Sequence, residues 1–199
     1  MKTVVPRGHD VRMSGGVGIR DVWQLVDEAR ADLGGAPSAD DVAAAMVRLL
    51  SSRPAAGIAA FDRPFDELMA VSYRADLWAA ACIINGGASG DGFDYFRGWL
   101  VAQGRDWFEC ALAHPDSLAA HPAVAAAADG GGDLDGEPVL YVVMDAYRDV
   151  TGEEEVPPYP DTVWIPDLDP DWNFDYGDRA EMRRRLPALV ALFDGEDEQ

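Results

Sequence analysis

The chain is poor in the residue types from which most metal and redox sites are built. Its 199 residues include two cysteines, three histidines and a single lysine. Cys82 and Cys110 form no CxxC motif, so we expect reduced, mostly buried thiols rather than a zinc ribbon or a dithiol redox pair. His9, His114 and His121 show neither HxxxH nor HExxH spacing. The sequence therefore predicts no cofactor.

Long apolar runs are also missing. No stretch approaches the roughly 18 consecutive apolar residues that a membrane-spanning helix requires. The start of the chain lacks the apolar region of a secretory signal. We therefore expect a cytoplasmic protein that does not enter a membrane.

Positive charge is scarce throughout the sequence. The chain carries 16 basic and 36 acidic residues, and its formal net charge is −20. The imbalance is greatest in residues 129–199, which hold 20 acidic and 5 basic residues. Such a field repels phosphates and anionic lipids, so we expect no binding to nucleic acid or to membrane surfaces. The acidity serves solubility, attracts a basic protein partner, or imitates a nucleic acid.

The apolar residues recur with a helical period, and no strand-like alternation is sustained. We predict an all-α fold with a single compact helical domain over residues 19–193. A flexible N-terminal arm (1–18) precedes this domain, and a disordered acidic tail (194–199) follows it. The predicted helices cover residues 20–33, 38–50, 65–73, 75–84, 92–103, 105–113, 138–152 and 178–193.

Three further features shape this prediction. Pro64 is expected to break or kink the chain near Arg63, because proline disrupts a helix interior. Residues 115–136, rich in alanine and glycine, are expected to form a flexible loop with at most one short helix. Residues 153–178 form an irregular acidic segment whose aromatic residues attach it to the body of the protein.

The chain resembles a bacterial family catalogued as domain of unknown function 4240. The similarity is most specific over residues 65–118, which read FDELMAVSYRADLWAAACIINGGASGDGFDYFRGWLVAQGRDWFECALAHPDSL. It extends more weakly over residues 20–193, from VWQLVDEAR to RRLPALVALF. The resemblance implies a cytoplasmic bacterial protein and brings with it no activity or catalytic residue.

The glycine-rich stretch NGGASGDG at residues 85–92 stands before a predicted helix. Such a turn can hold a phosphate at a helix N-terminus. This one lacks the P-loop lysine and the GxGxxG order, and Asp91 would repel phosphate unless a metal ion bridged them. Asp91 also replaces the last glycine of a GxSxG nucleophile elbow. The structural alternative is a corner between two helices, with Asp91 as the N-cap.

Charged residues follow this corner. Asp94 and Arg97 are three positions apart and are expected to pair along the helix. In an enzyme, Asp91, Asp94 and Arg97 would be the catalytic candidates, with Asp91 as base or metal ligand and Arg97 as an anion clamp. Ion pairs that only fix geometry are the alternative. The remaining ligand-binding candidates are Tyr73, Asp76, Asn85, Tyr95 and Arg105.

The stretch DLDPDWNFDYGD offers an imperfect calcium-loop pattern. Trp172 stands where the loop needs glycine, and Pro170 stiffens the chain. The alternative is a solvated acidic loop held by Trp164 and Trp172. The aspartates that match the spacing are Asp167, Asp169, Asp171, Asp175 and Asp178.

The sequence favours a non-catalytic protein-interaction module with an acidic surface. Aromatic residues can anchor a basic protein partner that carboxylates attract. The alternative is an enzyme, or a small-ligand or metal-dependent anion-binding protein, that uses a pocket around residues 73–105. That alternative requires Asp91, Asp94 and Arg97 to line an open pocket together with Tyr73 or Tyr95.

Overall fold

The computed structural model describes residues 17–194, and all regular structure among them is helical. The all-α prediction is therefore confirmed for this part of the chain. Nearly all of the predicted arm and acidic tail lie outside the described residues. The α-helices are α1 (Ile19–Leu33), α2 (Ala39–Ser51), α3 (Ala55–Ala59), α4 (Asp62–Val71), α5 (Ala75–Ile84), α6 (Gly90–Ala102), α7 (Arg105–Ala113), α8 (Pro122–Ala126), α9 (Val142–Thr151), α10 (Arg179–Arg185) and α11 (Pro187–Phe193).

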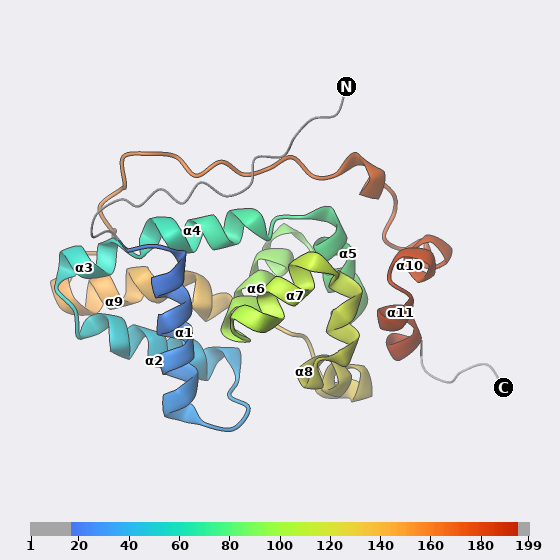
Figure 1. The fold of residues 1–199 in the computed structure, drawn as a ribbon, viewed down its shortest axis with the longest axis horizontal. Helices are drawn as coiled ribbons and strands as arrows, with labels where there is room; N and C mark the ends of the chain where they lie inside the picture. Colours follow the sequence, from blue (N-terminus) through green and yellow to red (C-terminus); the bar gives the residue numbers. More distant parts are fainter. Residues whose placement is uncertain (1–16, 195–199) are drawn as a thin grey trace.

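Short helices of other types join these elements. They are the 3₁₀ helices η1 (Pro115–Ala120), η3 (Glu137–Tyr141) and η4 (Pro170–Trp172), and the π-helical turn η2 (Ala127–Gly131). In Figure 1, α1, α2 and α9 form one end of the molecule, α6 and α7 its centre, and α10 and α11 the far end beside α5. None of the described helices is long and apolar enough to cross a membrane.

Local sequence explains most helix boundaries. Ser38 and Asp41 form a capping box at the start of α2: the Ser38 hydroxyl accepts from the Asp41 backbone N–H at 3.1 Å. Gly152 ends α9 in the left-handed conformation, as expected for a glycine after a helix. The helix predicted over residues 178–193 is interrupted after α10, and Pro187 begins α11, because proline fits the first turn of a helix but not its interior.

The region 115–136 is more ordered than predicted. It folds into η1, α8 and η2 in place of a flexible loop. Leu118 and Val124 are fully buried in the core, and this burial holds the two short helices against the protein. The alanine-rich composition of this region did not indicate that Leu118 and Val124 would be buried.

Two other boundaries differ in detail from the prediction. The helical chain does break close to Arg63, because α3 ends at Ala59 and α4 begins at Asp62, but Pro64 lies after the break, in the first turn of α4, where its missing N–H is not needed. The segment predicted as one helix over 138–152 begins as the 3₁₀ helix η3, and α9 starts only at Val142. Cys110 is exposed and Cys82 half-buried, so the predicted burial is wrong for Cys110.

The acidic segment, residues 153–178, is irregular apart from η4, as predicted. It runs above α4 along the upper side of the molecule in Figure 1. Tyr176 attaches its end to the body, because the hydroxyl donates to the Ala75 carbonyl at 3.0 Å. Trp172 is half-buried beneath the Arg185 guanidinium, 4.7 Å from its ring centroid. Trp164, in contrast, is 74% exposed, so the prediction that it holds the segment down is wrong.

Candidate functional site

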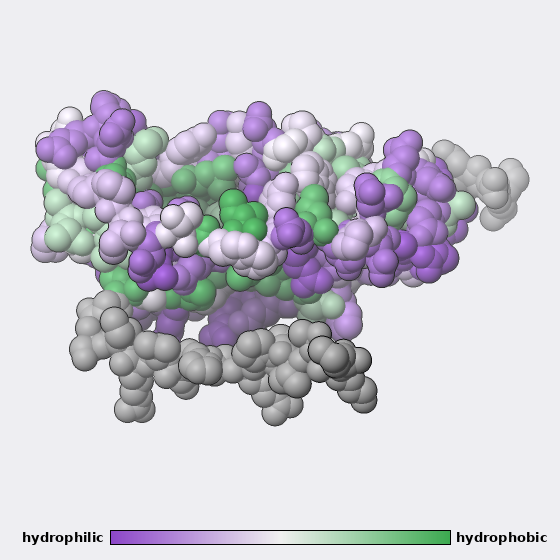
Figure 2. Space-filling view, turned by 90° about the horizontal axis from the view of Figure 1, so that it is seen from above, coloured by the Kyte–Doolittle hydropathy of each residue, from purple (hydrophilic) through white to green (hydrophobic). Residues whose placement is uncertain are grey.

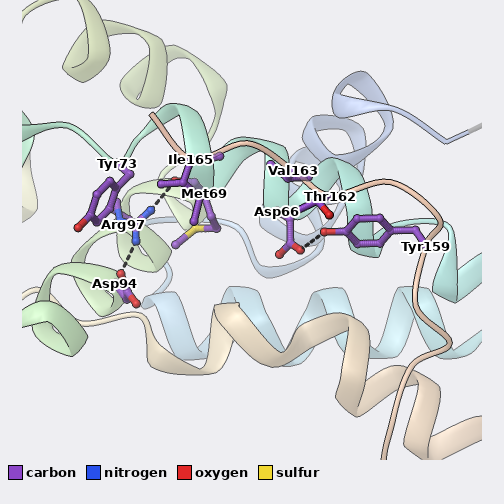
Figure 3. A pocket seen from close by; sticks show the side chains of 10 residues that line it. Asp66, Met69, Tyr73, Asp94, Arg97, Tyr159, Thr162, Val163 and Ile165 are labelled. Carbon is purple, nitrogen blue, oxygen red and sulfur yellow. Dashed lines mark hydrogen bonds and ion pairs between the residues drawn. The ribbon is translucent and has the colours of Figure 1, made fainter. Parts of the chain in front are cut away.

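A cleft of about 450 Å³ lies between α4, α6 and the acidic segment. We call it the α4–α6 cleft. Figure 3 shows Asp66 and Tyr159 at one end and Tyr73, Asp94 and Arg97 at the other, with Met69 between them. The outer wall is formed by Tyr159, Thr162, Val163 and Ile165.

Arg97 is the buried charge at this site. Its side chain is 6% exposed, and its guanidinium donates to the Met69 carbonyl and to the Asp94 carboxylate. The guanidinium carbon lies 5.3 Å from the ring centroid of Tyr73 and 4.9 Å from that of Phe93. Burial lowers the pKa of Arg97, while the hydrogen bond to Asp94 opposes this shift. The side chain thus fastens α6 to the C-terminal half of α4.

The other end of the cleft is closed by a contact between distant parts of the chain. The Tyr159 hydroxyl donates to Asp66 Oδ2 at 2.5 Å. This hydrogen bond raises the pKa of Tyr159 to about 12. An ion pair between Arg63 and Asp161, at 3.8 Å, supports the same crossing. Together these contacts hold the acidic segment over α4.

The electrostatic character of the cleft favours a cation. Asp66 Oδ1 and Asp94 Oδ2 accept no hydrogen bond from any described residue. The terminal nitrogens of Arg97 are already engaged, and its Nε is enclosed without a partner in the described part of the protein. Two carboxylates with open acceptors therefore face the cleft, and the geometry gives no support to Arg97 as an anion clamp.

The structure brings only three of the predicted site residues to this cleft, namely Tyr73, Asp94 and Arg97. Asp91 is exposed in the first turn of α6, and the N-cap is Ser89 instead, whose hydroxyl accepts from the Gly92 backbone at 3.1 Å. The corner was predicted correctly, but its capping residue was not.

The other predicted ligand-binding residues are engaged elsewhere. Asp76 pairs with Arg74, and Arg105 pairs with Glu109 at 2.7 Å. Asn85 exchanges two hydrogen bonds with the backbone of Leu134 and so fastens the loop before η3. A hydrogen bond with Glu137, on the side of α6 that contacts η3, raises the pKa of Tyr95.

The five aspartates of the calcium-loop pattern do not converge. Within residues 17–194 no three His, Cys, Asp or Glu side chains are placed to hold a metal ion. Asp169, Asp175 and Asp178 instead accept hydrogen bonds from backbone N–H groups two or three residues ahead. These aspartates cap turns and the start of α10.

Several residues that line the cleft were missed from the sequence. Asp66 and Met69 are three positions apart on α4, a spacing that places them on one helix face and could have marked them. Tyr159 and Ile165 carried no such signal, because their place depends on where an irregular segment crosses the body.

The fold and the site together define a helical protein whose irregular acidic segment covers a cleft. A family model described as protein of unknown function (DUF4240) matches residues 19–149, and the chain belongs to this family. The match includes α4 and α6 but ends before the acidic segment. No curated protein and no solved structure matches the chain.

Proposed function

We propose that this protein is a non-catalytic interaction module that binds a basic protein segment along its acidic segment. The observation that carries the proposal is the exposure of Trp164 and Ile165, which are 74% and 61% exposed. They are the two most exposed of the large hydrophobic residues described, and Leu168, three positions further along the chain, is also exposed, at 36%. Hydrophobic patches interrupt the hydrophilic surface on this face of the molecule (Figure 2).

Charge identifies the kind of partner. Exposed carboxylates flank the apolar side chains at Asp161, Asp167 and Asp169. Beneath them, the open acceptors of Asp66 and Asp94 can take a lysine or arginine side chain from the partner. A tryptophan anchor beside such carboxylates suits a partner that alternates basic and apolar residues.

The backbone of the acidic segment is also available. Residues 154–168 make no backbone–backbone hydrogen bond with any described residue. Their N–H and C=O groups can therefore form hydrogen bonds with a partner, and no backbone–backbone hydrogen bond has to break first. Side-chain contacts hold the start of this stretch at Glu154 and Tyr159, and the chain is attached again after it, at Tyr176. Held ends reduce the entropy lost on binding.

Selection from a displayed library of random peptides tests this proposal. We expect enriched peptides to combine lysine or arginine with apolar residues, and their affinity to fall as salt increases. A double variant, Trp164→Ser with Ile165→Ser, should weaken them at least about tenfold, as expected for the loss of an anchor. Val150→Ser, at an exposed apolar residue of α9, is the matched control and should change nothing.

Two outcomes count against the proposal. One is enrichment of peptides without basic residues. The other is binding that the double variant does not weaken relative to Val150→Ser.

A further inference from the structure

A second pocket, of about 440 Å³, opens between α6, α7 and α8 and the loops that follow α1 and precede η3. We call it the His121 pocket. It shares no lining residue with the α4–α6 cleft. Trp99, Trp107 and His121 supply aromatic walls, and Arg30 and Gln103 supply polar groups.

His121 is held rigidly in this pocket. It is 5% exposed, and its ring lies edge-on to Trp107 and Trp99, with centroids 4.4 and 5.2 Å away. Its Nδ1 accepts the backbone N–H of Ala123 at 3.1 Å and so caps α8. Because Nδ1 is an acceptor, the proton of the neutral ring is on Nε2.

The charge state of His121 is equally defined. Burial, with a smaller effect from the positive charge of Arg30, lowers the pKa of His121 to about 4. The ring is therefore neutral near pH 7, and its Nε2–H is a hydrogen-bond donor.

The Nε2–H of His121 has no acceptor among the described residues. Its nitrogen is not fully enclosed by the protein. The same holds for the indole N–H of Trp99, a side chain that is 4% exposed. Arg30 donates one Nη to the Ala102 carbonyl at 2.6 Å. No described residue accepts from its other nitrogens. A nearly buried donor without a partner, beside a cation and two indole rings, indicates a ligand with an acceptor group.

We propose that the His121 pocket binds a small aromatic carboxylate. The flat apolar body packs against Trp107 and Trp99, and the carboxylate accepts hydrogen bonds from His121 Nε2–H and Arg30. Asp133 and Asp135 stand on the exposed loop at the mouth of the pocket. Their charges disfavour a ligand that carries a second negative group at its outer end.

The probe for the experiment is 2-naphthoate, added to the whole protein labelled with ¹⁵N. The chain has six tryptophans, and each gives one indole N–H resonance. We expect saturable shifts of the Trp99 and Trp107 resonances, which single Trp→Phe variants assign. The matched ligand 2-naphthylmethylamine has the same rings with the opposite charge and should cause much smaller shifts.

His121→Asn separates the ligand contact from the helix cap. Asparagine is a good N-cap, so α8 should persist, while the ring donor is lost. We expect naphthoate to bind this variant at least about tenfold more weakly than the wild type, because a hydrogen bond to a charged acceptor is lost. Trp78→Phe is the control, because the Trp78 indole already donates to the Ala88 carbonyl outside this pocket.

The proposal is overturned if millimolar naphthoate leaves the Trp99 and Trp107 resonances in place. It is also overturned if the amine binds as tightly, or if His121→Asn binds naphthoate as well as the wild type while the other four indole resonances show an intact fold. A positive result does not depend on the proposed partner of the acidic segment, since the two sites share no residue.

Discussion

Arg97 illustrates how one buried residue joins two helices. It is 5% exposed, yet it carries a charge, and its hydrogen bonds reach Asp94 on its own helix and the Met69 carbonyl on α4. Taking a guanidinium out of water is costly unless a counter-charge compensates it. Asp94 supplies that counter-charge, although its own side chain is 45% exposed.

Asp94→Ala should therefore lower the free energy of unfolding by about 2 kcal/mol, because it leaves the Arg97 charge buried without its counter-charge. Urea denaturation measures this change. The control is Asp91→Ala in the same helix: Asp91 is exposed, and only a favourable helix-dipole contact of about 0.5 kcal/mol is lost. Equal effects of the two substitutions would contradict a stabilising role for the pair.

His121 predicts a second residue-scale effect, on acid stability. In the unfolded chain a histidine binds its proton near pH 6.5, whereas in the fold the pKa of His121 is about 4. Between these values the unfolded state binds more protons, so acid destabilises the fold, by about 3 kcal/mol at most. We expect His121→Asn to lose less stability than the wild type between about pH 7 and about pH 4. Parallel pH curves for the two proteins would refute this.

At the scale of elements, a close backbone approach joins α6 to the loop before η3. The Gly136 N–H donates to the Tyr95 carbonyl at 3.0 Å. A Cβ built on Gly136 would lie 2.2 Å from the Trp99 backbone nitrogen, and one on Gly98 would lie 2.5 Å from the Gly136 carbonyl oxygen. Only two facing glycines allow this contact, which also positions Trp99 in the wall of the His121 pocket.

Gly136→Ala should destabilise the protein by about 3 kcal/mol or more, because backbone must move to admit the methyl group. A thermal melt shows the loss as a lower Tm. Gly90→Ala is the matched control: Gly90 starts α6 with open space around its Cβ position. Alanine there should be neutral or slightly stabilising, by up to about 0.5 kcal/mol. A wild-type Tm for Gly136→Ala would show that the loop does not hold this close contact.

At the scale of the whole molecule, the charge of −20 opposes compactness. Most of the excess lies after residue 128, so the acidic segment is held on the protein against repulsion from neighbouring carboxylates. Contacts such as Tyr159 with Asp66 and Arg63 with Asp161 provide the opposing attraction.

Added sodium chloride should therefore raise the Tm, because at about 0.1 M salt the repulsion between exposed charges more than about 10 Å apart is largely screened. A variant with Glu155→Gln, Asp167→Asn and Asp171→Asn carries less exposed negative charge and should show a smaller rise. Calorimetry at low and high salt makes the comparison. A Tm that falls with salt would mean that attractive ion pairs outweigh the repulsion.

The sequence by itself determined the helical class, most helix positions, several of the caps and the family. These features depend on residues a few positions apart, such as Ser38 with Asp41, or on the period of apolar side chains. The Asp94–Arg97 pair was predictable for the same reason, since one turn of helix brings the two together.

Only the tertiary structure decided which of these residues share a site. Tyr159 contacts Asp66, and His121 lines one pocket with Arg30, across long stretches of chain, and no local pattern encodes such neighbours. The exposure of Trp164 also reversed the prediction that its ring holds the acidic segment against the protein. The physical reason is that burial and pocket shape depend on how whole elements pack, whereas hydrogen-bonded turns and helix caps are completed within a few residues.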